Sequence, residues 1–365
     1  MKRKIVISGI NIFEGGALSI FYDCLDSIVS LHLDSEFEFT VFVNSVSLFN
    51  RYIGHFSFIE LPKSRKHYWN RVWYEYFYFH RYSSKKHIYL WFSIHDITPN
   101  VVSEKRFVYC HNPSPFYKST IKDLFIDPKL FLFSRLYMFL YKINIQKNDA
   151  VIVQEQWMKK EFLKRTKAKH VIVSKPSISF TFSSYLKQDT TSKRFSFFYP
   201  AFPRSFKNFE VICQAAAILN DSLPFDIFLT IDGTENKYSK NIVKRYSKIE
   251  NIHFLGRLSR NGVFDMYKFS DCLLFPSRLE TWGLPITEFK ETKKPIVLSD
   301  LPYAHETLGN YEKACFFDQD SSTSLANIMR KLITRDYSVL SKAFSPNFSD
   351  FNDWPSLLKW MVLEK

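Results

Sequence analysis

The segment FPSRLETWGLPITEFKETKKPIVL, Phe275–Leu298, decides the fold of this chain. It begins at the end of one short apolar run, and Pro295–Leu298 form the next. Between these predicted strands, a turn with Gly283 and Pro285 leads into a helical stretch. Proline suits the first turn of a helix, because an N–H there would have no partner inside the helix. This order of strand, turn, helix and strand predicts a parallel βαβ unit.

The same alternation extends over the rest of the chain and predicts two series of buried strands. The first series is Ile5–Ile10, Phe39–Val43, His87–Phe92, Phe107–Tyr109, Ala150–Val153 and His170–Val173. The second series is Phe195–Tyr199, Asp226–Ile231, Ile252–Leu255, Asp271–Phe275 and Pro295–Leu298. Short buried runs separated by helices are typical of parallel sheets, so we expect an α/β chain with two doubly wound, Rossmann-like domains facing a cleft.

The stretch Ser179–Ser192 is rich in Ser and Thr, lacks a clear period, and predicts the domain boundary. We therefore expect an N-terminal Rossmann-like domain at 1–185 and a C-terminal Rossmann-like domain at 186–345. An amphipathic helix is predicted within 346–365, where Trp354, Leu357, Leu358 and Met361 share one side. We expect this helix to pack back on the N-terminal domain.

The composition excludes several other classes of protein. Hydrophobic residues make up 46% of the 365 residues, which is too many for a disordered chain. The five cysteines are scattered without a CxxC pair, which argues against a disulfide framework or a zinc site and fits a reducing cytoplasm. The apolar run at Ile5–Ile7 ends too soon for a signal peptide, and no run of eighteen apolar residues predicts a membrane span.

The net charge of +14 is uneven along the chain. Residues up to Leu186 carry 26 Lys and Arg against 15 Asp and Glu, and the remainder carries 24 against 21. A basic first half predicts an anionic partner, namely nucleic acid, phospholipid or a phosphorylated substrate. Within it, Lys63–Phe92 combines seven Lys or Arg with twelve aromatic residues, and Phe131–Lys147 is similar. These stretches predict contact with an anionic membrane surface, unless they form an aromatic core helix with a solvated basic face.

The opening segment also carries a pattern of chemical groups. Glu280 and Glu288 are separated by seven residues, and Gly283 lies between them. Glycine allows a close approach of the backbone to a ligand, and the free amides at a helix start suit a diphosphate. We therefore expect both carboxylates to face one ligand and to accept from its hydroxyls. The intervening residues that we expect to bind the phosphates and sugar are Thr281, Trp282, Gly283 and Leu284.

This frame resembles the Glu-x7-Glu signature of the large retaining glycosyltransferase family 4, which has the GT-B fold. Pro276-Ser277 before the frame and Lys294-Pro295-Ile296-Val297 after it match the family's register. The resemblance covers Phe195–Leu332 well and the first domain only in outline. By this resemblance, Glu280 contacts the donor sugar and Glu288 contacts the ribose of the nucleotide.

Further residues follow from the resemblance. In the family, a basic pair after the first strand of the second domain neutralises the donor diphosphate, and Lys207 and Arg204 occupy this place. The second basic residue usually lies about five positions earlier, where this chain has Phe202, so Arg204 is a substitute for it. Arg257 follows a short strand whose loop commonly touches the nucleobase in the family. In the first domain, Gly15 and Gly16 follow the first strand and match a turn that approaches the donor.

Two histidines compete for the catalytic neighbourhood, because the family often places a His near the donor's reactive centre. His95 ends one predicted strand and His111 ends the next, so either one could match. Both strand ends are expected at the ligand-binding edge of the sheet.

The resemblance implies a front-face reaction, in which the acceptor hydroxyl enters where the nucleotide diphosphate leaves. The leaving charge must be stabilised, and Lys207, Arg204 and backbone amides can do so without a metal. We therefore expect a metal-independent enzyme. The nucleotide-sugar is then a co-substrate, and no cofactor or metal is expected.

The family's common use, together with the basic half, predicts assembly of an O-antigen or capsule. We expect a peripheral protein at the cytoplasmic face of the membrane with an undecaprenyl-diphosphate-linked acceptor. A different GT-B enzyme such as a sugar-nucleotide epimerase is also conceivable, and the Glu-x7-Glu frame argues against it. The chain could also be a catalytically inactive scaffold or a nucleic-acid-binding protein, but acidic residues in a phosphate groove would oppose nucleic acid.

Overall fold

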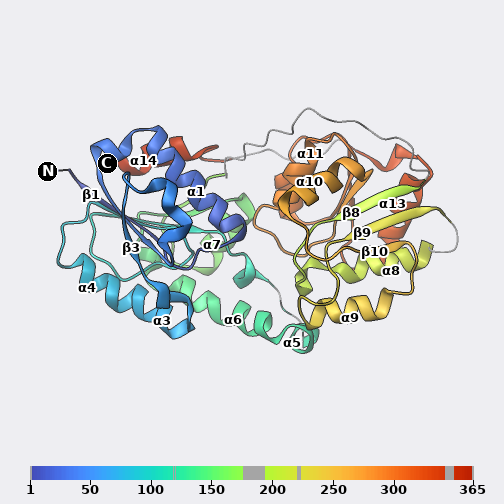
Figure 1. Cartoon of the computed structure of the whole chain (residues 1–365), viewed down its shortest axis with the longest axis horizontal. Helices are drawn as coiled ribbons and strands as arrows, with labels where there is room; N and C mark the ends of the chain where they lie inside the picture. Colours follow the sequence, from blue (N-terminus) through green and yellow to red (C-terminus); the bar gives the residue numbers. More distant parts are fainter. Residues whose placement is uncertain are drawn as a thin grey trace. The chain divides into compact units, whose positions relative to one another are not determined.

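The computed structural model describes residues 2–117, 119, 121–175, 194–219, 223–341 and 349–363. They form two compact units, each built on one parallel sheet with helices on its faces (Figure 1). The first unit comprises Met1–Phe116, Phe133–Ile178 and Phe348–Lys365, and the second comprises Tyr117–Leu132 and Ser179–Asn347. The α/β class with two doubly wound sheets is therefore confirmed, while the predicted boundary at Ser179–Ser192 lies outside the described residues.

The sheet of the first unit has the strand order β3-β2-β1-β4-β5-β6-β7, and all its pairs are parallel. Its strands are β1 (Lys4–Gly9), β2 (Glu38–Val43), β3 (Ser57–Glu60), β4 (Leu90–Ser93), β5 (Lys105–Cys110), β6 (Ala150–Val153) and β7 (Val171–Val173). The order reverses between β1 and β4, which makes this pair the switch point of the sheet.

The first unit holds seven of the described α-helices. They are α1 (Gly15–Ser30), α2 (Leu33–Glu36), α3 (Tyr68–Trp73), α4 (Phe79–Ser83), α6 (Pro128–Lys142), α7 (Gln156–Arg165) and α14 (Trp354–Leu363). Of these, α6 begins in the Tyr117–Leu132 segment of the second unit. Short turns of other helix types are η1 (Val46–Tyr52), η2 (Pro62–Arg65), the π-helical η3 (Tyr74–Tyr78), η4 (Ser114–Phe116) and η5 (Ile145–Lys147). In α1, buried residues recur at Phe21, Cys24, Leu25 and Ile28, which is the spacing of one helix face.

The last described helix, α14, completes the core of the first unit. Trp354, Leu357, Leu358, Met361 and Val362 belong to the same buried cluster as residues of β1, β2, β4 and α1. The Trp354 ring stacks on Tyr109 with 5.3 Å between centroids, and the Tyr109 ring comes from β5. Tyr89 Oη donates a hydrogen bond of 2.7 Å to the carbonyl of Val362. The end of the described chain is thus an integral part of the first unit.

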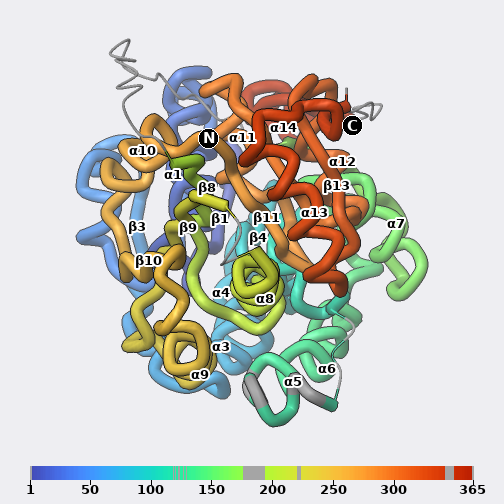
Figure 2. The backbone as a smooth tube through the Cα atoms, turned by 90° about the vertical axis from the view of Figure 1, so that its right-hand side faces the viewer, coloured from blue at the N-terminus to red at the C-terminus, as the bar shows by residue number. Residues whose placement is uncertain are grey.

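The sheet of the second unit has the order β10-β9-β8-β11-β12-β13, again with parallel pairs only. Figure 2 faces this unit and shows β10, β9, β8, β11 and β13 following one another across the sheet. The strands are β8 (Phe195–Tyr199), β9 (Phe225–Leu229), β10 (Ile252–Phe254), β11 (Cys272–Phe275), β12 (Ile296–Ser299) and β13 (Ala314–Phe317). Here the order reverses between β8 and β11.

The helices of the second unit cover both sheet faces. They are α5 (Ile121–Ile126), α8 (Phe209–Leu219), α9 (Lys237–Tyr246), α10 (Arg260–Phe269), α11 (Leu284–Lys290), α12 (Pro302–Leu308) and α13 (Ser322–Ile333), with the short turns η6 (Ser205–Lys207) and η7 (Tyr337–Val339). Asn236 and Ser239 form a capping box at the start of α9, which fixes where that helix begins.

The division into units differs from the predicted boundaries in the segment Tyr117–Leu132, which the sequence predicts in the first domain. The Tyr117 ring lies 6.1 Å from the Phe206 ring, and Asp127 pairs with Arg204. These contacts explain why the segment groups with the second unit.

In the part of the chain that the structure describes, none of the helices combines the length and hydropathy that a bilayer crossing requires.

Candidate functional site

The switch point of the second sheet brings two of the predicted residues together. Lys207 follows β8 and Glu280 follows β11, and these strands are neighbours at the place where the strand order reverses. The Lys207 ammonium donates a hydrogen bond to Oε1 of Glu280. The two side chains are only 18% and 13% exposed. Ligands of doubly wound sheets bind at this position, because the loops leaving the two strands diverge and leave a crevice.

Backbone contacts hold the two loops in register. The amide of Arg278 donates to the carbonyl of Phe206 at 2.7 Å, and Tyr199 Oη donates to the carbonyl of Lys207 at 2.9 Å. Asn208 has a left-handed backbone with φ of 57°, and its side-chain amide donates to the carbonyl of Gln319 at 2.9 Å. Left-handed backbone is tolerated by Asn better than by most residues. These hydrogen bonds fix the loops that carry Lys207 and Glu280.

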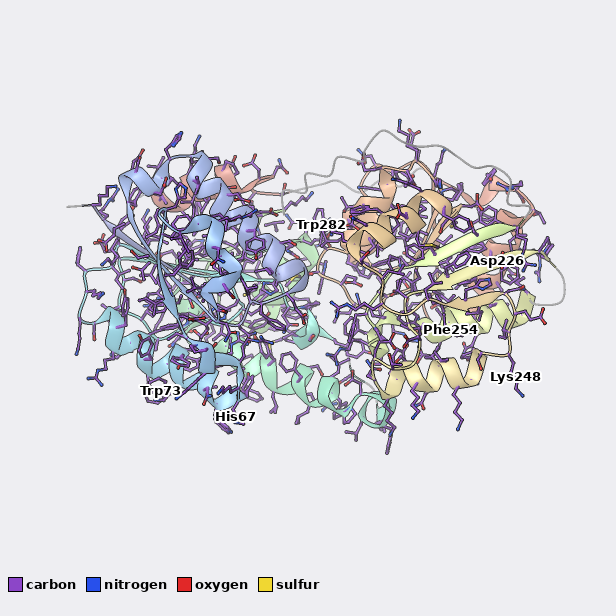
Figure 3. The ribbon with its side chains drawn as sticks, in the orientation of Figure 1. His67, Trp73, Asp226, Lys248, Phe254 and Trp282 are labelled. Atoms are coloured by element: carbon purple, nitrogen blue, oxygen red, sulfur yellow. The ribbon has the colours of Figure 1, made fainter. Side chains whose placement is uncertain are left out.

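The predicted turn at the start of α11 has the expected backbone. Gly283 has φ of +75°, which favours glycine, and a Cβ there would lie 2.9 Å from Cδ1 of Ile286, so the Ile286 side chain would have to shift. Pro285 stands in the first helical turn. Trp282 is nearly buried, and its indole N–H donates to Oγ1 of Thr287 at 2.9 Å. Figure 3 labels Trp282 among the side chains of the second unit.

The turn is flanked by residues of intermediate exposure. Thr281 and Leu284 are both partly exposed beside the buried Trp282 and Gly283. The hydroxyl of Thr307 donates to the carbonyl of Trp282, which fixes that peptide from the side of α12. The N–H groups at this turn thus occupy a rigid backbone.

Glu288 lies one turn inside α11 in a second polar cluster. The residue is 5% exposed. Tyr267 Oη donates to Oε2 at 2.8 Å, and Nη2 of Arg260 lies 3.2 Å from Oε1. Burial and the Glu288 carboxylate raise the pKa of Tyr267 well above its ordinary value, so the phenol remains a donor at neutral pH. Glu280 and Glu288 thus have different side-chain partners, and their contact with one shared ligand stays a prediction.

Tyr267 and Arg260 were not among the predicted site residues. They belong to α10, where Arg260, Phe264 and Tyr267 recur at helical spacing. That spacing places them on one face, but it carries no information about which helix this face meets.

Arg204 does not join Lys207 and Glu280. Its Nη1 lies 3.4 Å from Oδ2 of Asp127, and its side chain is 47% exposed. The guanidinium also lies 5.8 Å from the centre of the Phe202 ring.

The loop after β10 meets the loop after β9. Gly256 has φ of +69°, and a Cβ there would lie 2.7 Å from Oδ2 of Asp232. Arg257 follows directly and is exposed. The exposed guanidinium of Arg257 therefore lies at the same carboxyl-terminal edge of the sheet as Lys207.

In the first unit, the two predicted histidines have different environments. His95 is 1% exposed, while the side chain of His111 is 18% exposed. Nη2 of Arg71 lies 3.2 Å from Nδ1 of His95 and also donates to its carbonyl at 2.7 Å. Because Arg71 can only donate, Nδ1 must accept, and the ring proton is on Nε2. Burial, and then the charge of Arg71, lower the pKa of His95 well below its ordinary value, so the ring is neutral.

Behind His95 lies a buried carboxyl group that the sequence did not indicate as functional. Glu75 is fully buried in the π-helical turn η3, and its Oε1 lies 3.3 Å from Nε2 of His95 and 3.9 Å from Nε of Arg71. Burial raises the pKa of Glu75 to about 8, against the smaller opposing effect of Arg71. Ser8 Oγ lies 3.0 Å from the same His95 nitrogen. His95 is therefore held inside a polar cluster and does not reach the surface.

His111 lies at the carboxyl end of β5 on a fixed backbone. Asp96 has φ of 77°, and its Oδ1 accepts from the amides of His111 and Asn112 at 2.8 and 2.9 Å. Tyr141 Oη donates to the same oxygen at 3.2 Å. Of the two histidines, His111 is the one that a ligand could touch.

The predicted glycine turn of the first unit is also exposed. Gly15 has φ of +68° and begins α1, and a Cβ there would meet no atom within 4 Å. Gly16 is exposed beside it. The open backbone at the start of this long helix fits a ligand contact, since its first N–H groups have no partners within the helix.

A cavity of about 560 Å³ lies elsewhere in the first unit. Lys105, Asp149 and His170 line it, and they stand at the amino ends of β5, β6 and β7. Ligands of such sheets bind at the opposite, carboxyl ends. The cavity is therefore separate from the candidate site residues.

Known proteins are similar to this chain in sequence and in fold. Residues 186–347 match the protein family described as "Glycosyl transferases group 1". Over 233 residues the chain is 23% identical to the O-antigen chain mannosyltransferase RfbU of Salmonella typhimurium, a match covering 61% of this chain and 63% of that protein. The chain thus spans less than two thirds of the curated relative's length.

Solved structures show the fold. The structure of WaaG, a glycosyltransferase involved in lipopolysaccharide biosynthesis, matches with a TM-score of 0.67 and 12% identity, over 99% of this chain and all of that one. HepE of Anabaena in complex with UDP-glucose matches with a TM-score of 0.61 and 14% identity, over 98% and 95% of the two chains. The chain has the GT-B fold, as predicted.

Proposed function

We propose that this protein is a retaining glycosyltransferase that transfers a hexose-type sugar from a nucleotide-sugar to a growing, lipid-linked glycan. The observation that carries the proposal is the contact between Lys207 and Glu280 at the switch point of the second sheet. The group 1 glycosyl transferase match over residues 186–347 supports the same function.

In this proposal Lys207 is the residue that stabilises the leaving nucleotide diphosphate. Its ammonium lies at the switch point of the sheet on a loop that hydrogen bonds hold in place, so little reorganisation is needed when negative charge develops. A bound diphosphate would replace Glu280 as its counter-ion. Glu280 would then be available to accept hydrogen bonds from hydroxyls of the donor sugar. Arg204 is a second candidate cation, provided that it leaves Asp127.

Glu288 is proposed to bind the nucleotide ribose. Its carboxylate is oriented by Tyr267 and Arg260, which leaves lone pairs on both oxygens for hydroxyl donors. The turn residues Thr281–Leu284 are proposed to contact the phosphates and sugar, and Arg257 the nucleobase. Gly15 and Gly16 are also proposed to contact the donor.

The chemistry is proposed to follow the front-face course, with retention of the anomeric configuration and without a metal. Lys207 supplies a fixed cation of the kind that neutralises a diphosphate, so the proposal needs no additional ion. His111 is the proposed histidine near the reacting sugar, because it is partly exposed at a strand end. His95 is proposed to act as a positioning residue.

The acceptor side of the proposal rests on relatives and on charge. RfbU is an O-antigen chain mannosyltransferase, and WaaG is involved in lipopolysaccharide biosynthesis. We infer a role in O-antigen or capsule assembly, with an undecaprenyl-diphosphate-linked acceptor. The uneven net charge of +14 fits a peripheral location on the inner face of the cytoplasmic membrane.

Isothermal titration calorimetry against UDP, GDP, dTDP and CDP tests the donor part of the proposal. Wild type should bind one nucleotide selectively, and Lys207→Ala and Glu288→Gln should each weaken it at least tenfold. Lys248→Ala and Glu250→Gln change exposed residues of the same unit and serve as matched controls (Figure 3 labels Lys248). Binding to none of the four, or equal affinities in all five proteins, would refute the proposal.

Product analysis tests the reaction itself. Incubation of the selected nucleotide-sugar with a membrane lipid extract should give a glycolipid whose anomeric configuration, read by NMR, matches that of the donor. Activity should persist in EDTA if no metal takes part. Release of an epimerised donor without transfer would instead identify a sugar-nucleotide epimerase.

A further inference from the structure

An unusual set of large aromatic side chains faces solvent on α3 and η3 of the first unit. Trp69, Trp73 and Phe77 are 80%, 52% and 66% exposed, and they recur at intervals of four residues. Four-residue spacing places them along one side of a helix. Figure 3 labels Trp73, which projects outward at the border of the unit. The residues that point inward from the same helices are Arg71 and Glu75.

The neighbouring helix α6 repeats this pattern. Leu136, Phe139 and Ile143, within it and just after it, are 54%, 68% and 41% exposed. The Arg71 guanidinium of α3 lies 5.9 Å from the centre of the Tyr137 ring of α6, so the two helices are in contact. Figure 1 shows α4, α3 and α6 along the same border of the first unit. We define the aromatic face as Trp69, Trp73, Phe77, Leu136, Phe139 and Ile143.

The charges around the aromatic face have one sign. Between Leu61 and Lys86 the only carboxylate is the buried Glu75, and Pro128–Asn148 contains none. The exposed cations of these two segments include Lys63, Lys66 and Arg81 in the first and Lys142 and Lys147 in the second.

We propose that the aromatic face is the surface by which the first unit docks on an anionic lipid membrane. The inference rests on the proposed membrane-associated function and adds the elements that make the contact. Trp and Phe rings beside Lys and Arg are the residues that interfacial helices use, with rings at headgroup level and cations on lipid phosphates.

The charge of the aromatic face favours a lipid bilayer over a second copy of this chain or another protein as its partner. A second copy of this chain would bring the same cations against each other, which opposes a symmetric pair. The surfaces that bind proteins are depleted in Lys relative to the rest of a protein surface, whereas the two segments that carry this face contain exposed Lys. An anionic bilayer offers complementary charge to every exposed cation and an apolar layer to every exposed ring.

Vesicle co-sedimentation tests the proposal with the full chain. Wild type should bind vesicles of phosphatidylcholine with phosphatidylglycerol at least tenfold better than vesicles of phosphatidylcholine alone. A variant with Trp69→Ser, Trp73→Ser and Phe77→Ser should lose at least tenfold of this binding. The matched control carries Ile53→Ser, Val102→Ser and Leu163→Ser, which replace exposed apolar residues of the same unit, and it should bind as wild type does.

Replacing single lysines gives two further, independent variants. Lys63→Gln and Lys142→Gln should each lower the partition coefficient roughly fivefold, which corresponds to the usual contribution of one lysine near an anionic surface. Lys164→Gln and Lys167→Gln, exposed on or near α7, are the controls. Added salt should weaken binding of wild type more than that of the lysine variants.

Three outcomes would overturn the proposal: equal binding of the aromatic variant and wild type, equal binding to both vesicle types, or no binding at all. A concentration-dependent dimer in sedimentation velocity that the aromatic variant abolishes would assign the face to a second copy instead. Nucleotide binding is measured on the same samples. If the wild type binds the nucleotide but not the vesicles, this inference fails and the proposed transferase function does not.

Discussion

Replacement of Glu75 by glutamine should change the pH dependence of stability in the first unit. The Glu75 carboxyl is fully buried, and neither of its oxygens accepts a hydrogen bond from any residue that the structure describes. Burial raises its pKa to about 8. The groups that face it are Arg71, the neutral His95 and, through His95, the hydroxyl of Ser8. Glutamine has nearly the same shape as the protonated acid and cannot ionise.

The size of the effect follows from the pKa shift. The ordinary pKa of the group is 4.5, so between pH 4.5 and about 8 the folded unit keeps a proton that the unfolded chain has released. The stabilisation that this proton gives the folded unit is complete below pH 4.5 and is lost as the pH rises through 8. The free energy of unfolding should fall by about 1.4 kcal/mol per pH unit in this window, and by at most about 5 kcal/mol in total.

Hydrogen exchange read by mass spectrometry on peptides from β1 and β4 reports the opening of the first unit alone. Between pH 5 and 8, the unfolding free energy of wild type should decline relative to that of Glu75→Gln. All other titrating groups are shared and cancel in this comparison. A carbon-13 carboxyl resonance that is absent in the variant should titrate near pH 8. If the unfolding free energies of wild type and Glu75→Gln run parallel over the whole pH range, Glu75 is ionised and paired with Arg71. That result would refute the reasoning.

Three further changes have definite expected outcomes. Trp354→Ala should destabilise the first unit by about 3–5 kcal/mol, since the ring is buried, and exchange in the second unit should stay unchanged. Gly283→Ala should lower the free energy of unfolding by about 1–2 kcal/mol, because alanine disfavours the left-handed backbone, and the clash with Ile286 would add to this cost. The melting temperature and the nucleotide affinity should both fall. Retention of both would contradict the described geometry of the turn. Lys294→Met removes an ammonium that donates hydrogen bonds to carbonyls at the end of α10. Hydrogen exchange in the last turn of α10 should therefore accelerate by about ten- to a hundredfold, because a charged hydrogen bond contributes about 1.5–3 kcal/mol.

Most strands could be predicted from the sequence, because parallel strands are buried on both faces and appear as short apolar runs. Ala150–Val153 and Phe195–Tyr199 were predicted to the residue. The two missed strands, β3 and β13, both lie at a sheet edge. The sequence of β3, SFIE, has partly exposed residues only, so no apolar run distinguishes it.

The site was predictable where the signal is local and unpredictable where it depends on tertiary contact. Gly283 has the positive φ that a glycine in such a turn suggests. The sequence could not separate His95 from His111, because both follow strands and only the packing of Arg71 and Glu75 decides which one is buried. Likewise, the eight-residue interval between Glu280 and Glu288 gives no hint that they pair with different loops and helices.

The packing of α14 into the first unit has a consequence for synthesis on the ribosome. The strands of the first sheet are complete once Val173 has been made, but their cover at Trp354–Leu363 follows the entire second unit. At usual translation speeds, this delay lasts roughly 10 to 35 seconds. During that time the apolar surface that α14 covers, which includes Phe92 and Tyr109, stays exposed, so we expect chaperones to bind the nascent first unit while the second unit is already able to fold.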